Sequence, residues 1–80
     1  MNATQKKWFE QLEKCLSKMP KGVELAVTNA GGGYADIILL EAGKADSMMS
    51  AEDDMHLVDF GSASLSQFIA EKITVNSENL

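Results

Sequence analysis

The sequence predicts a small α+β domain, a two-layer sandwich with two helices on one face of a three-stranded antiparallel meander. Three observations predict this class. A helical pattern opens the chain, alternating strand patterns fill its middle, and a second helical pattern lies near its end. Eighty residues make a single domain, 1–80, whose tail is expected to fray over about 76–80. The expected element order is α-β-β-β-α.

The first helix is predicted over residues 3–19, where apolar side chains recur at helical spacing. Asn2 and Gln5 are spaced as a capping box, and Pro20 is expected to end the helix. A thiol inside this stripe is expected to be buried and inert, which is the interpretation of Cys15. The stripe consists of Trp8, Phe9, Leu12, Cys15, Leu16 and Met19.

A hairpin is predicted from residues 23–28 and 34–41, joined by the glycine-rich residues 29–33. We expect Thr28 to lie opposite Tyr34, because a shift by one residue would place polar side chains on the apolar face. One face then holds Val23, Leu25, Val27, Ala35, Ile37 and Leu39. The other face holds Glu24, Ala26, Thr28, Tyr34, Asp36, Ile38 and Leu40.

The second half of the chain is predicted to hold a long connection, a third strand and a second helix. Residues 42–54 form the connection, with a helical turn near Met48 and Met49. Residues 55–60 are predicted as the strand. Residues 64–73 are predicted as the helix, because they open with the capping-box pattern Ser-x-x-Gln and continue with apolar residues at helical spacing.

Three short patterns look like functional motifs but lack the context that each motif needs. The glycines at 31–33 lead into a strand, whereas a phosphate loop leads into a helix, so they are interpreted as a turn. Residues 56–63 look like the Asp-Phe-Gly segment of protein kinases, without the other kinase motifs. Residues 52–54, with Asp46, lack the spacing of a calcium loop. No cofactor or metal is expected.

We do not favour an enzyme acting through Asp36, His56 and Asp59. These residues are expected to share one region of the sheet, but no nucleophile with a positioned base accompanies them. His56 is the single histidine, with no neighbouring cysteine to complete a zinc site. We therefore expect no catalytic residue and a protein that is not an enzyme.

Charge is unevenly distributed along the chain. Residues 1–21 hold five lysines and two acids, a net charge of +3, and residues 22–80 hold two lysines and ten acids, a net charge of −8. An acidic body without arginine repels nucleic acid and suits a partner protein with a basic surface. One cysteine, no secretion signal and no membrane-length apolar segment lead us to expect a cytoplasmic protein that binds no membrane.

If both helices cover the face of Val23, Leu25 and Val27, the opposite face stays open as an apolar patch, which is typical of an interface. The alternative is that residues 42–54 cover it, with Met48 and Met49 against the sheet. Under the first interpretation the protein binds a basic partner, or itself as a homodimer with a structural or regulatory role. The expected partner-binding residues are Tyr34, Asp36, Ile38, Leu40, Glu52, Asp53, Asp54, Met55, Leu57 and Asp59.

The opening segment, KKWFEQLEKCLSKMPKGVEL, resembles small accessory proteins of phages and prophages. The resemblance lies in chain size, charge and a leading amphipathic helix that ends at a proline, and it covers about the first quarter of the chain. It implies a protein that binds and inhibits or redirects a host factor, as anti-CRISPR inhibitors do.

Overall fold

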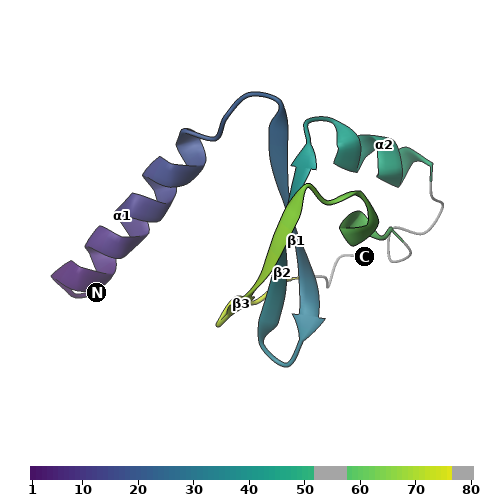
Figure 1. Ribbon diagram of the computed structural model, residues 1–80. Coiled ribbons are helices and arrows are strands. Elements are labelled where there is room, and N and C mark those ends of the chain that lie inside the picture. Colours follow the sequence, from purple (N-terminus) through teal and green to yellow (C-terminus); the bar gives the residue numbers. More distant parts are fainter. Residues whose placement is uncertain (52–57, 77–80) are drawn as a thin grey trace.

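A computed structural model describes residues 1–51 and 58–76, and there the α+β fold class is confirmed (Figure 1). The three strands form one antiparallel sheet in the order β1-β2-β3, which is the predicted meander. The element order differs from the prediction, because two helical segments separate β2 from β3. The elements are α1 (Ala3–Ser17), β1 (Val23–Gly31), β2 (Tyr34–Glu41), α2 (Lys44–Ser50), the 3-10 helix η2 (Phe60–Ala63) and β3 (Ser66–Glu71).

The glycine run closes the hairpin between β1 and β2, as predicted. Gly32 and Gly33 have φ angles of +60° and +85°, the left-handed conformation that a tight two-residue hairpin turn requires. Asn29 Oδ1 accepts a hydrogen bond of 2.7 Å from the Gly31 N–H, beside a bulge in the strand pairing. The glycines therefore turn the chain.

The predicted register is wrong by two residues, since Thr28 pairs with Asp36 and not with Tyr34. The bulge at Asn29 and Gly31 lengthens β1 past the expected end of the strand. Side chains alternate with a period of two, so a two-residue shift leaves each of them on its predicted face. The division of β1 and β2 into two faces is unaffected by this error.

The helix predicted over residues 64–73 is wrong, because this segment forms β3. The Leu65 N–H donates to the Leu39 carbonyl at 2.8 Å, and the Lys72 N–H donates to the Gly33 carbonyl at 3.1 Å. Between these two bonds, Phe68 pairs with Ile37. Strand pairing along the apolar β2 outweighs the local capping-box pattern, which is a weak signal when tertiary contacts compete with it.

The strand predicted over residues 55–60 is also wrong where the structure describes it. Residues 55–57 lie outside the described residues. Val58 and Asp59 belong to no regular element, and Phe60 begins η2. Gly61 and the small residues after it favour a tight 3-10 turn over an extended chain.

The face of the sheet that carries Ile38 and Leu40 is covered around these two residues, contrary to the expectation that it stays open. Ile38 and Leu40 are 3% and 0% exposed, whereas Ile69 on the same face of β3 is 64% exposed. The alternative expectation is met for α2, which lies on this side of the sheet together with η2 (Figure 1), and residues 52–54 of the expected cover lie outside the described residues. The Ala45 N–H of α2 donates to Glu24 Oε1 at 2.9 Å, which fixes α2 to this face.

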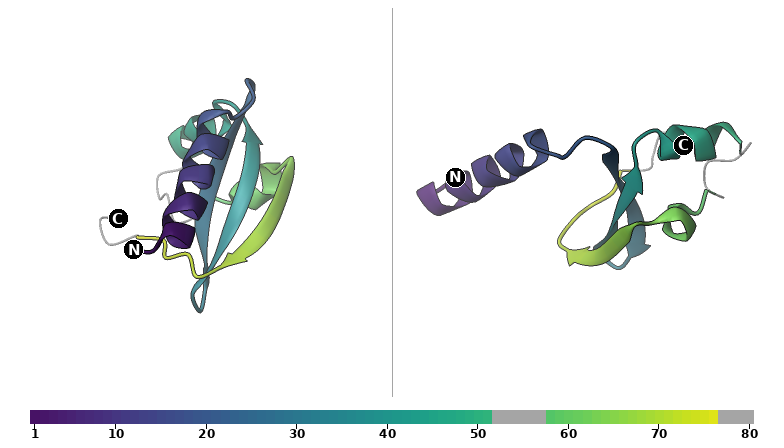
Figure 2. Two further views of the ribbon diagram at one scale, coloured as in Figure 1. Left: turned by 90° about the vertical axis from the view of Figure 1, so that its left-hand side faces the viewer. Right: turned by 45° about the horizontal axis from the view of Figure 1, so that its top comes forward.

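Helix α1 lies on the opposite side of the sheet from α2 and η2 and projects away from it (Figures 1 and 2). The prediction that both helices share one face is therefore wrong. The predicted capping box is present: the Gln5 N–H donates to Asn2 Oδ1 at 2.8 Å, and the Asn2 N–H donates to Gln5 Oε1 at 3.0 Å. No residue of α1 is buried. The start of the helix is therefore set by its capping box and not by a tertiary contact.

Candidate protein-binding surfaces

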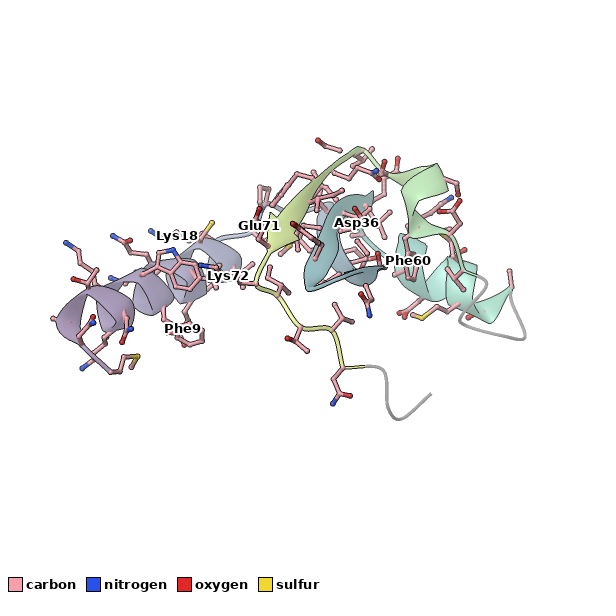
Figure 3. The ribbon with its side chains drawn as sticks, turned by 90° about the horizontal axis from the view of Figure 1, so that it is seen from below. Phe9, Lys18, Asp36, Phe60, Glu71 and Lys72 are labelled. Atoms are coloured by element: carbon pink, nitrogen blue, oxygen red, sulfur yellow. The ribbon has the colours of Figure 1, made fainter. Side chains whose placement is uncertain are left out.

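Helix α1 presents its apolar stripe to solvent. Trp8 and Phe9 are 62% and 61% exposed, and their rings lie 6.5 Å apart in a tilted arrangement. They border a shallow hollow of about 530 Å³ that also contacts Met1 and Gln5. In Figure 3, Phe9 lies on α1 well away from the sheet. We call Trp8, Phe9, Leu12, Cys15, Leu16 and Met19 the helix stripe; Cys15 is exposed with it, so the expectation of a buried thiol is wrong.

A second apolar surface lies on the face of the sheet that α2 does not cover. Phe68 on the edge strand β3 is 63% exposed, and Val27 on β1 is 46% exposed. A shallow groove of about 210 Å³ runs between β1 and β3, over Leu25, Ile37 and Leu39. We call this set the open sheet face; its members are Leu25, Val27, Ile37, Leu39 and Phe68.

The chain exposes far more surface than a folded monomer of its mass. Its accessible surface is 6449 Å², whereas the scaling of area with mass gives about 4,700 Å² for a monomer of 8.7 kDa. The radius of gyration is 14.3 Å, against about 11.6 Å for a compact chain of this length. Among the described residues, the buried apolar side chains are Ala35, Ile38 and Leu40. A binding partner could cover part of this excess of about 1,700 Å².

The structure separates the residues that the sequence predicts as one partner-binding set. Tyr34 is half-exposed near the hairpin turn, and Asp36 is partly buried on β2 (Figure 3). Asp59 is exposed at the start of η2. Ile38 and Leu40 lie in the core, so they offer no surface to a partner. Glu52, Asp53, Asp54, Met55 and Leu57 lie outside the described residues.

Sequence reasoning missed the residues that form the open sheet face. It placed Leu25 and Val27 on the correct face but expected helices to cover them. It placed Phe68 on a helix. Phe68 and Ile69 are adjacent apolar residues, so residues 66–71 show no strict alternation that could have identified β3. No signal in the sequence shows which face α2 covers, because β2 is apolar on both faces.

Among the described residues, no group of three or more His, Cys, Asp or Glu side chains is placed to hold a metal ion. Across the same residues, every helix is too short or too polar to cross a bilayer. Comparisons with protein-family models, with curated proteins and with solved structures found no match. Function therefore has to be argued from the two apolar surfaces and the charge of the chain.

Proposed function

We propose that this chain is a non-enzymatic protein-binding module whose two apolar surfaces are completed by another polypeptide. The observation that carries the proposal is the exposure of large apolar side chains on α1 and on the open sheet face, in a chain whose accessible surface exceeds that of a folded monomer of its mass by about 1,700 Å². Exposed aromatic side chains such as Trp8, Phe9 and Phe68 are of the residue types that anchor protein interfaces. A patch of this kind costs free energy in water, and that cost is removed when a partner covers it.

The second part of the proposal is that the partner has a basic surface, and the negative charge of the chain from residue 22 onward supports it. Glu41, Asp46, Asp59 and Glu71 are exposed, and the region from residue 22 onward carries a net charge of −8. Such a surface accelerates the approach of a positively charged protein and disfavours acidic ones. Together with the resemblance of the opening segment to phage accessory proteins, it makes a host protein with a nucleic-acid-binding groove the first class of partner to test.

The test compares the wild type with Phe68→Glu, in the open sheet face, and with Ser47→Glu, a matched control on the exposed side of α2. Partners retained from a lysate of the source cells are purified and titrated against each protein by calorimetry. We expect the control to lose no affinity and Phe68→Glu to bind at least about tenfold more weakly, because Phe68→Glu places a charge in the apolar contact. A basic partner will bind more slowly at high salt.

Two results would contradict the proposal. One is equal affinity of all three proteins for every purified partner. The other is a monomer that binds no polypeptide while its apolar surfaces are covered by each other. A second copy of the chain counts as a polypeptide partner in this test, and its contribution is measured separately below.

A further inference from the structure

We infer that the polypeptide covering the open sheet face is helix α1 of a second copy, and that two copies exchange their helices across a two-fold axis. This inference rests on the proposed function and names its first partner. Each copy carries one uncovered apolar helix and one uncovered apolar sheet face, so each supplies what the other lacks. Such reciprocal contacts close as a dimer and leave neither surface free for a third copy.

The dimensions of the two surfaces match. With its 15 residues, α1 is about 22 Å long, and the eight residues of β2 extend about 27 Å. Three strands at a spacing of about 4.8 Å span about 10 Å, which is the diameter of one helix. A single helix along the groove over Leu25, Ile37 and Leu39 would therefore cover most of the open sheet face.

The exposed area is large enough for a stable dimer. If the whole excess of about 1,700 Å² were removed from each copy, the dimer would bury about 3,400 Å² in total, which is an upper bound because the excess belongs to the whole chain and not to the two apolar surfaces alone. This value lies within the range of obligate homodimers, about 2,000–5,000 Å², and above the range of weak encounters. A standard interface with an unrelated protein needs about half of that area.

Charge also favours this occupant. The segment that contains α1 carries a net charge of +3, and the remainder of the chain carries −8. Exchange brings the basic segment of each copy close to the acidic remainder of the other, and the attraction is reciprocal. The exposed acids Asp46 and Asp59 lie on the far side of the sheet, so this attraction acts over a distance and not within the apolar contact.

The linker between α1 and β1 favours exchange over closure within one chain. Pro20 fixes its own φ and restricts Met19 to extended conformations. Gly22 is held at the start of the sheet by a 3.0 Å hydrogen bond from the Ala42 N–H to its carbonyl. Few freely rotating bonds remain to swing α1 from its projecting position onto its own sheet. Short linkers of this kind favour exchange between copies.

The test measures mass by light scattering after size exclusion, together with the fluorescence of Trp8, the single tryptophan. The helix variant is Leu12→Gln/Leu16→Gln, and the sheet variant is Phe68→Glu. We expect the wild type and Ser47→Glu to have twice the chain mass of 8.7 kDa, with a blue-shifted Trp8 emission. Each interface variant is expected to dissociate at a concentration at least about tenfold higher. Because α1 has no buried residue, the helix variant cannot fail by unfolding a core.

Mixing the two interface variants is the decisive step. The intact α1 of Phe68→Glu can dock on the intact sheet face of the helix variant, so a heterodimer is expected where each variant alone is a monomer. A dimer that survives the helix substitutions overturns the exchange. A monomer with solvent-exposed Trp8 also overturns the exchange, but it leaves the proposed function standing. A monomer with buried Trp8 overturns both the exchange and the proposed function, because α1 then covers its own sheet.

Discussion

Leu40→Ala is expected to remove most of the stability of the fold. Leu40 is fully buried on β2, on the face of the sheet that α2 and η2 cover. Truncating a buried leucine costs about 2–5 kcal/mol, through lost burial and the cavity left behind. A domain of this length has a total stability of about 4–12 kcal/mol. The midpoint of thermal unfolding should therefore fall by at least about 10 °C in far-UV circular dichroism.

Leu65→Ala is the matched control, because Leu65 lies just before β3 with more than half of its side chain exposed. A truncation at such a surface position is expected to change stability by less than about 0.5 kcal/mol. Both proteins should be compared with the wild type at one concentration, since association adds to apparent stability. Equal effects of the two substitutions would contradict the assignment of Leu40 to the core. By the same reasoning, Ile38→Glu should unfold the chain and not merely dissociate a dimer.

Lengthening the linker is expected to convert the exchanged dimer into a monomer. The change inserts Gly-Ser-Gly-Ser between Pro20 and Lys21, which allows α1 to reach its own sheet face. A short flexible linker holds its two ends at an effective concentration in the millimolar range. At micromolar protein, closure within one chain should then exceed exchange by about a hundredfold or more. Light scattering should give one chain mass, with Trp8 still buried.

The same four residues appended after Leu80 provide the control, since they change composition and length without changing the linker. This protein should remain a dimer. If the linker insertion leaves the dimer mass and its dissociation constant unaltered, the connection between α1 and β1 has no part in choosing exchange over closure. The helix would then have to be joined to the second copy by some other contact.

The parts of the fold that could be predicted are those with a strong local pattern. The helix stripe and the capping box predicted both ends of α1 to within two residues, because Pro20 lies just beyond its end. The glycines predicted the hairpin, since three left-handed positions in succession suit no other residue so well. The two faces of the hairpin were predicted correctly even though the bulge at Asn29 shifted the register.

The parts that could not be predicted depend on contacts between distant segments. Ser64 and Gln67 form a capping pattern, but β3 forms because β2 needs a neighbour on its second edge. The sequence pattern does not show whether Ile38 and Leu40 or Ile37 and Leu39 are the buried pair, because β2 is apolar on both faces. Only the path of α2, fixed by the contact between Ala45 and Glu24, decides which pair is buried. The candidate binding face was missed for this reason.

In the proposed dimer, the acidic side of each of the two copies remains accessible to a partner. Asp46 and Asp59 lie on α2 and at the start of η2, on the side of the sheet away from the open sheet face. An exchanged dimer would present this side of both copies to a basic partner. Two linked surfaces bind one extended partner more tightly than either does alone, provided that the partner can reach both.

The exchange of α1 between two copies is tested most directly by the reactivity of Cys15 in the unmodified protein, followed over a range of protein concentrations. Cys15 lies in the helix stripe and is exposed in a single chain. If two copies exchange their helices, its rate of reaction with a neutral thiol reagent falls at least about tenfold as the concentration rises through the range of dimer formation. A rate that is the same at every concentration would rule out the exchanged dimer, because α1 would then not be covered by a second copy.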